Sequence, residues 1–279
     1  MKALFDQLSF RTSKIVTQRY STSFSLGILG LKRELHAPIY AIYGFVRFAD
    51  EIVDTFHDYP KERLLKDFKR DTYKAIEDGI SLNPILNSFQ SVVREYDIDL
   101  DLIETFLHSM EMDLDPTREY DQKMYDKYIL GSAEVVGLMC LKVFVEGSKS
   151  EYDRLKDSAM KLGSAFQKIN FLRDLSADFH ELGRTYFPGV DLGNFDEQTK
   201  IRIEEDIEKD FAAGFEGIKQ LPKGSRFGVY IAYVYYYSLF GKIKRTSASV
   251  IFKERIRIPN RRKYRLFLSS YLRHSFNLL

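Results

Sequence analysis

Apolar residues recur at spacings of three and four along most of the chain, the period expected of helices that bury one face. Segment 34–56 is densely apolar and holds one polar cluster, whereas several later segments alternate charged and apolar positions. The pattern predicts helices over residues 34–56, 61–79, 85–95, 99–113, 123–146, 152–181, 197–219, 224–245 and about 262–276. We therefore predict an all-α fold.

The prolines and glycines support these boundaries. The seven prolines fall between segments or near a helix start, and none occurs between Pro116 and Pro188, which permits long helices there. The stretch from Leu182 to Phe195 is rich in glycine and is predicted to be a loop. With no repeat and no low-complexity linker, residues 1–279 are predicted to form a single domain.

A first polar cluster lies within the apolar segment 34–56. Arg47, Asp50 and Asp54 are spaced by three and four, so they share one face of the predicted helix. Two carboxylates one turn apart repel each other and favour a cation between them, either a metal ion or Arg47. Taken alone, the pair is better explained as a solvated surface pair.

A second cluster changes that interpretation. Gln167, Asn170, Asp174 and Asp178 form a polar stripe about three turns long on an otherwise apolar segment, with Arg173 beside it. Two helices that each carry an Asp-x-x-x-Asp pair and an arginine can face one another across a bundle. Magnesium binds carboxylates and substrate phosphates together, and arginines add bidentate phosphate contacts. The two clusters predict a magnesium-assisted diphosphate site.

A third cluster, Tyr20 to Phe24, is rich in hydroxyl groups. One interpretation is a helix start, where Ser or Thr caps a backbone amide. The other is that the hydroxyls bind diphosphate oxygens. The local sequence leaves both open.

Composition and charge exclude several classes. The 42 basic and 40 acidic residues nearly balance, which argues against a nucleic-acid binder. Cys140 is the single cysteine, which suits a reducing cytoplasm. The first ten residues do not resemble a signal peptide, and no run of about 18 uncharged apolar residues predicts a membrane span. The 40 Phe and Tyr residues suit an ordinary core, with a greasy cavity as the alternative.

Taken together, the clusters resemble the squalene/phytoene synthase family over residues 15 to 265. The resemblance rests on five ordered blocks: Tyr20 to Phe24; Ile39 to Arg47 leading into Asp50 to Asp54; Tyr128 with Val136 to Cys140; Gln167 to Asp178; and Gly183 to Pro188. A lone Asp-x-x-x-Asp pair is unspecific, whereas this ordered set is strongly specific.

The resemblance implies an isoprenoid synthase-type helical bundle with a central cavity. It implies Mg²⁺, with Mn²⁺ as an alternative, at Asp50, Asp54, Asn170, Asp174 and Asp178. The implied catalytic groups are those four aspartates with Arg47. The implied substrate contacts are Tyr20, Ser21, Ser23, Phe24, Arg47, Tyr128, Gln167, Asn170, Arg173 and, on a looser alignment, Arg255.

The implied reaction joins two geranylgeranyl diphosphates head to head into phytoene, through a cyclopropylcarbinyl diphosphate (prephytoene diphosphate) and without NADPH. The alternative is the same chemistry on farnesyl diphosphate, giving dehydrosqualene or hydroxysqualene. A non-catalytic family member should have lost one or more of the aspartates, and all four are present.

The chain departs from the family pattern after Tyr128. Many relatives carry Tyr-x-Tyr-x-Val-Ala-Gly there, and this chain has Leu130 in place of the second tyrosine and Glu134 in place of the glycine. Glu134 could lie near the cavity or be paired within the bundle. The substitution leaves the substrate chain length open.

A basic segment lies near the C-terminal end. Seven Lys or Arg residues fall between Lys253 and Arg265, opposed only by Glu254. A solvated charged segment is the default interpretation, but anionic lipids attract such segments. We therefore expect a cytoplasmic enzyme that binds prenyl diphosphates and no nucleic acid, with peripheral contact to the inner membrane surface as a hypothesis. The sequence does not predict the oligomeric state.

Overall fold

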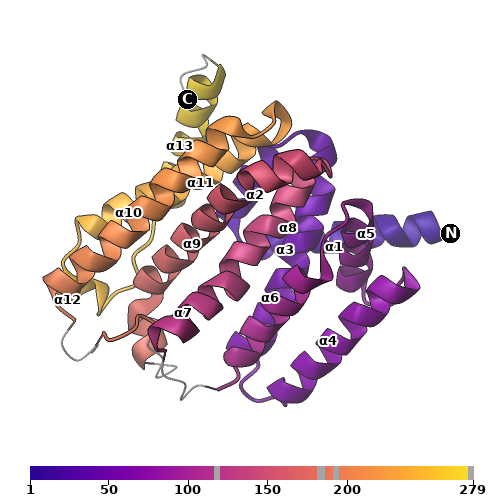
Figure 1. Cartoon of the computed structure of the whole chain (residues 1–279), viewed down its shortest axis with the longest axis horizontal. Helices are drawn as coiled ribbons and strands as arrows, with labels where there is room; N and C mark the ends of the chain where they lie inside the picture. Colours follow the sequence, from indigo (N-terminus) through magenta and orange to yellow (C-terminus); the bar gives the residue numbers. More distant parts are fainter. Residues whose placement is uncertain (116–119, 181–185, 191–194, 276–279) are drawn as a thin grey trace.

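The computed structural model describes residues 1–115, 120–180, 186–190 and 195–275, and every regular element in these ranges is a helix (Figure 1). The helices are α1 (Lys2–Tyr20), α2 (Thr22–Leu29), α3 (Arg33–Asp54), α4 (Lys61–Asp78), α5 (Pro84–Glu95), α6 (Leu100–Met112), α7 (Gln122–Ile129), the π-helical turn η1 (Leu130–Glu134), α8 (Val135–Phe144), α9 (Lys149–His180), α10 (Glu197–Gln220), α11 (Lys223–Lys244), α12 (Ala248–Ile251) and α13 (Asn260–Ser275). The predicted all-α fold is confirmed.

One prediction needs correction. Segment 123–146 was expected to be one regular helix, and the structure divides it into α7, η1 and α8. Gly163 of α9 explains how α9 can pack closely here, because a Cβ on it would lie 2.7 Å from the carbonyl oxygen of Ala133 in η1. The π turn therefore lies where α9 crosses it at a glycine, Gly163, which has no side chain to keep the two backbones apart.

The apolar residues form two large cores. In the first, Phe45 of α3 stacks on Phe89 of α5 with ring centroids 3.8 Å apart. The second joins α9, α10 and α11 around Phe211 and Phe240, whose centroids are 5.6 Å apart. The helices of both cores contribute side chains to one internal cavity.

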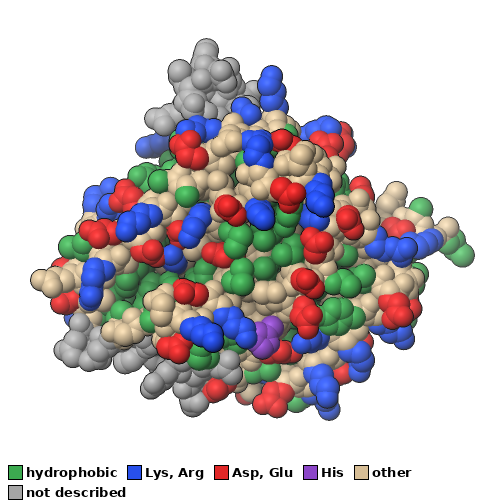
Figure 2. Space-filling model, viewed as in Figure 1, with side chains coloured by type: hydrophobic (Ala, Val, Ile, Leu, Met, Phe, Trp, Pro, Cys, Tyr) green, Lys and Arg blue, Asp and Glu red, His purple; other side chains and the backbone are tan. Residues whose placement is uncertain are grey.

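The surface shows the mixed charge that the composition indicates. On the face drawn in Figure 2, acidic and basic side chains are interspersed over the helices. None of the described helices is long and apolar enough to cross a membrane. That residues 1–279 form one domain stays a prediction.

Candidate active site

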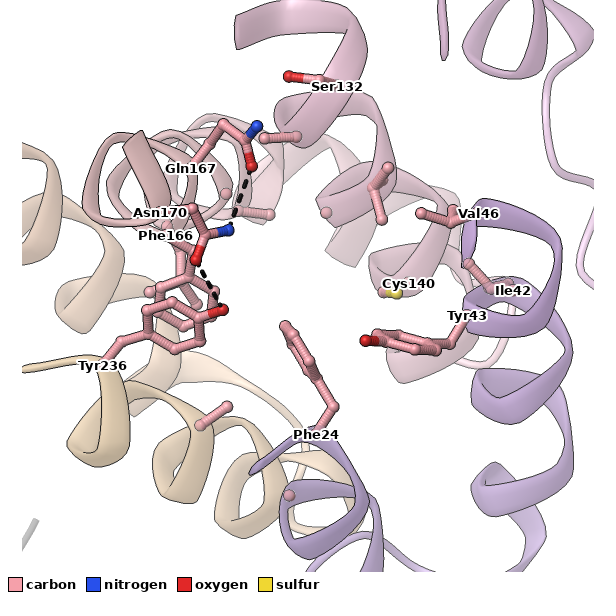
Figure 3. A pocket seen from close by; sticks show the side chains of 18 of the residues that line it. Phe24, Ile42, Tyr43, Val46, Ser132, Cys140, Phe166, Gln167, Asn170 and Tyr236 are labelled. Carbon is pink, nitrogen blue, oxygen red and sulfur yellow. Dashed lines mark hydrogen bonds between the residues drawn. The ribbon is translucent and has the colours of Figure 1, made fainter. Parts of the chain in front are cut away.

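A cavity of about 660 Å³ lies between α2, α3 and α8 on one side and α9, α10 and α11 on the other. Its interior is largely apolar and aromatic, and Figure 3 shows several of these side chains pointing into the open space. The labelled apolar and aromatic residues are Phe24, Ile42, Tyr43, Val46, Cys140, Phe166 and Tyr236. Ten of the aromatic residues line the cavity, and several others lie in the two cores, so the aromatic content serves both.

The first polar cluster lies in the last turns of α3, where Arg47, Asp50 and Asp54 all line the cavity. Arg47 bonds Asp50 through one nitrogen, and its other terminal nitrogen lies 2.5 Å from the carboxylate of Glu51. The Arg47 guanidinium also lies 4.4 Å from the ring centre of Tyr20. Arg47 is therefore one cation beside Asp50, and it is shared with Glu51, a residue that the sequence analysis did not single out.

The environment of Asp50 holds excess negative charge. Burial raises the pKa of its carboxyl from 3.8 to about 7, and repulsion from Asp54 adds to the rise. Arg47 acts in the opposite direction, while Asp113 and Glu51 raise the pKa further. The cluster also lies at the C-terminal end of α3, where the helix dipole disfavours anions. This end of the cavity would be stabilised by additional positive charge.

Asp113 is a second residue that the sequence analysis missed. It follows the last residue of α6, is only 4% exposed, and accepts a 2.7 Å hydrogen bond from the hydroxyl of Tyr128. The hydroxyl of Tyr186 lies 3.4 Å from its other oxygen. Its sequence neighbours Glu111 and Asp115 are also acidic, so only the fold distinguishes Asp113.

The second polar cluster lines the cavity from α9. Arg173 holds its neighbour Asp174 through two nitrogens at 2.9 and 2.5 Å. Arg255 reaches the same carboxylate at 2.6 Å, so the loosely aligned Arg255 does lie at this site. Unlike Asp50, Asp174 is balanced by two guanidinium groups.

Gln167 and Asn170 continue this wall into the cavity. The Asn170 amide donates to the Gln167 oxygen at 3.3 Å, and the Tyr236 hydroxyl donates to the Asn170 oxygen at 3.4 Å (Figure 3). The predicted stripe of Gln167, Asn170 and Asp174 therefore lies on one face, toward the cavity. The Asp178 side chain and the Gly183–Thr185 part of the fifth block lie outside the described residues.

The Tyr20 to Phe24 cluster caps a helix, and its hydroxyls also border the cavity. The Ser21 hydroxyl caps α2 by accepting from the Phe24 amide at 3.2 Å, and Ser21 also lines the cavity. Ser23 lies instead in an adjoining hollow of about 420 Å³, together with Arg255, Arg257 and Lys263. The hollow and the cavity share Tyr20, Ser21, Arg173, Tyr236 and Arg255, so hydroxyl and basic groups surround their junction.

The departures after Tyr128 have different locations. Tyr128 lines the cavity as expected, whereas Glu134 is not among the lining residues. Burial raises the pKa of Glu134, and its nearest charges include Lys161 and Asp210 of the α9–α10 pair. Glu134 therefore belongs to the bundle. Ser132, one turn after Tyr128, does line the cavity.

The next feature is which described side chains could hold a metal ion. They include no group of three or more His, Cys, Asp or Glu side chains arranged to hold an ion. Mg²⁺ does not need such a cage, because it binds through one or two carboxylates and completes its shell with phosphate oxygens and water. The carboxylate oxygens of Asp50 and Asp54, in surroundings that favour positive charge, fit that requirement.

Comparison with known proteins identifies relatives of this chain. A family model described as squalene/phytoene synthase matches residues 17–262. Phytoene synthase 1 of Solanum lycopersicum is 25% identical over 82% of this chain and 60% of its own length. Presqualene diphosphate synthase of Rhodopseudomonas palustris is 31% identical over 60% of this chain and 58% of its own length. The chain thus spans about 60% of the length of these relatives.

The fold also resembles that of a solved structure. The structure of a dehydrosqualene synthase in complex with ligand superposes with a TM-score of 0.83 and 22% identity, over 96% of this chain and 98% of that one. The likeness identifies the helical isoprenoid synthase fold that was predicted.

Proposed function

Because the chain belongs to the squalene/phytoene synthase family, we propose that it joins two prenyl diphosphates head to head. The observation that carries this proposal is that one apolar cavity is lined by two polar clusters. The cavity suits hydrocarbon chains, while the Asp50 and Asp174 clusters with their arginines suit two diphosphate groups.

The carboxylates and the arginines of the two clusters have different roles. We propose that Asp50 and Asp54, with Asn170, Asp174 and Asp178, hold Mg²⁺ or Mn²⁺, which would neutralise diphosphate charge and make it a better leaving group. Arg47, Arg173 and Arg255 would donate to diphosphate oxygens, since a guanidinium matches that geometry. To do so they must exchange their present carboxylate partners for phosphate.

The cavity wall serves the carbon chemistry. The first substrate loses diphosphate, and its allylic cation is attacked by the double bond of the second, which loses a proton to close a cyclopropane ring. The second diphosphate then leaves, the skeleton rearranges, and loss of another proton gives a triene. The aromatic faces of Phe24, Tyr43 and Phe166 would stabilise the cations, and the apolar lining would exclude water.

We propose geranylgeranyl diphosphate as the substrate and phytoene as the product, as part of carotenoid biosynthesis. The lining follows α9 from Asp174 back to Leu155, about 28 Å at the helical rise of 1.5 Å per residue. Ser158, Ala159 and Gly217 line the cavity at that end. The likeness to presqualene diphosphate and dehydrosqualene synthases supports farnesyl diphosphate as the second candidate.

The partners and location remain proposals of the same kind. The phytoene reaction is redox-neutral, so we propose that it proceeds without NADPH. We also propose a cytoplasmic enzyme whose basic segment, Lys253 to Arg265, contacts the inner membrane surface. Arg261, Arg262 and Arg265 of this segment are exposed, as that contact requires.

The test is an assay of the purified chain with Mg²⁺ and no NADPH, offering each substrate separately and reading products by mass. A C40 triene from geranylgeranyl diphosphate is the expected result. A C30 product from farnesyl diphosphate alone would retain the chemistry and reassign the substrate. Tight diphosphate binding without any product would contradict the proposed function.

A further inference from the structure

The first helix buries a row of polar residues against the body of the protein. Ser9, Ser13 and Thr17 of α1 are fully buried, and the Ser13 hydroxyl lies 2.7 Å from that of Ser88 on α5. Small residues are required here, because a Cβ on Gly44 of α3 would lie 3.0 Å from the Ser13 hydroxyl. The close approach of α3 therefore explains the polar inner face, but it does not explain the outer one.

The outer face carries an apolar stripe. Leu4, Leu8 and Ile15 are 60%, 50% and 50% exposed. At 3.6 residues per turn these three positions fall within about 40° of one another around the helix axis. Single exposed apolar residues are ordinary, whereas three aligned on one helix indicate a surface that another body covers.

The charges beside the stripe indicate which body. Arg11 and Arg19 lie about 40° to either side of its centre, and both are exposed. Over residues 1–20 four basic side chains face a single acid, Asp6, and that acid is bonded to Lys2 at 2.8 Å. An apolar stripe bordered by basic residues matches a helix that lies in the surface of an anionic bilayer.

A second copy of the chain fits less well. In a two-fold interface the same patch meets itself, so Arg11 and Arg19 of one copy would lie against the basic-bordered stripe of the other without an acidic partner from it. A bilayer with anionic headgroups has complementary charge and accepts the leucine side chains between its lipids.

The position of α1 connects this stripe to the cavity. The helix ends at Tyr20, which lines both the cavity and the adjoining hollow. At its other end α1 projects from the body in Figure 1, and Figure 2 shows hydrophobic atoms at that tip. Leu4, Leu8 and Ile15 all precede residue 17, where the family match begins.

We propose that α1 is an interfacial helix that docks the enzyme on an anionic lipid bilayer through Leu4, Leu8 and Ile15, with Arg11 and Arg19 on the headgroups. Docking brings the junction of the cavity and the hollow, at Tyr20, close to lipids that hold prenyl substrates. That benefit rests on the proposed function, whereas the docking itself rests on α1 alone.

The test is flotation of the full chain with vesicles of phosphatidylcholine alone or mixed in equal parts with phosphatidylglycerol. The variant Leu4→Ser/Leu8→Ser/Ile15→Ser removes the stripe. Its matched control, Leu82→Ser/Leu100→Ser/Ile201→Ser, removes three exposed apolar residues elsewhere. Thermal melting establishes that both variants fold.

We expect wild type and control to float with the anionic vesicles, and the stripe variant to bind at least about tenfold more weakly. Equal flotation of all three proteins would overturn the proposal. So would a wild type that ignores vesicles but forms dimers that the stripe variant lacks.

Turnover of substrate dispersed in detergent separates this proposal from the function. We expect the stripe variant to turn over dispersed substrate at the wild-type rate. A wild type that binds vesicles through the stripe but is inactive in detergent would leave the docking intact and contradict the function. An active wild type whose flotation does not depend on the stripe would do the reverse.

Discussion

At the scale of single residues, the site is defined by an imbalance between its two walls. Asp174 is held by Arg173 and Arg255, whereas Asp50 shares Arg47 with Glu51 and faces further carboxylates. The wall formed by α3 is therefore where added positive charge stabilises the protein most. We make one prediction for Asp50 and one for the hydrogen bond between Tyr128 and Asp113.

The first concerns Asp50. Its folded-state pKa of about 7 exceeds its ordinary value of 3.8, so the folded chain binds the extra proton between these values. The stability that protonation provides is lost as pH rises through that window. Asp50→Asn should therefore melt above wild type at pH 8 without metal, by about 2–4 °C for each kcal/mol gained. The two should converge only below about pH 4, where Asp50 is protonated in the unfolded chain as well as in the folded one.

The same variant should lose at least about a hundredfold in turnover with Mg²⁺, because a metal and diphosphate contact is gone. Asp101→Asn, at an exposed position on α6, serves as the control and should change neither property. A fully active Asp50→Asn enzyme, or one whose stability follows pH as wild type does, would argue against this account of the α3 wall.

The second concerns the hydrogen bond between Tyr128 and Asp113. Tyr128→Phe removes a donor to a buried carboxylate, so unfolding should become easier by about 1.5–3 kcal/mol in a denaturant titration. Tyr59→Phe, at a tyrosine that is 65% exposed, is the matched control and should cost little. Equal stability of the two variants would mean that this bond does not hold the cavity wall.

Sequence reasoning located the residues that repeat along a helix but not those that meet through the fold. Arg47, Asp50 and Asp54, or Gln167, Asn170 and Asp174, share a face because of their spacing, and that much was predictable. Asp113 comes to the site through Tyr128, fifteen residues away, and no local pattern marks such a contact. The roles of these residues in binding and catalysis stay predictions.

At the scale of elements, helical periodicity predicted α3 to α6, α9, α10 and α11 to within a few residues. It did not predict η1, because a π turn depends on what crosses it. Nor did it indicate α1, whose polar positions face inward against Gly44 while leucines face outward. In both places a close approach between helices overrides the local pattern.

The close approach of α9 to η1 gives a prediction for Gly163. A Cβ there would lie 2.7 Å from a backbone oxygen, which cannot yield as a flexible side chain can, so Gly163→Ala should destabilise by about 1–3 kcal/mol. Gly241→Ala is the control, since its nearest neighbour is the flexible end of Arg245 at 3.6 Å. That change should be neutral or stabilise α11 by up to about 1 kcal/mol. Chemical denaturation of both variants would reveal the contrast, and a harmless Gly163→Ala would contradict it.

At the scale of the whole molecule, two cores are separated by a cavity that neither fills. A packed interior normally leaves few voids larger than a water molecule, so a cavity of about 660 Å³ costs stability and indicates a bound occupant. Sequence composition could only suggest this, because the same aromatic residues serve both core and cavity.

The depth of the cavity gives a prediction about substrate length. Ala159→Leu adds bulk at the deep end, about 22 Å along α9 from Asp174. We expect kcat/KM to fall more for geranylgeranyl than for farnesyl diphosphate, by about tenfold or more in the ratio of the two. An equal fall for both substrates would mean that the deep end does not hold the chain terminus.

The most direct test of the whole account is a crystal structure of the chain with Mn²⁺ and an unreactive thiodiphosphate analogue of the prenyl substrate, read by anomalous scattering. We expect metal peaks at the carboxylates of Asp50 and Asp54 and of Asp174 and Asp178, diphosphate between the α3 and α9 walls, and hydrocarbon running down the cavity past Phe166. Hydrocarbon outside the cavity, or metal bound away from these four carboxylates, would contradict the assignment of this site.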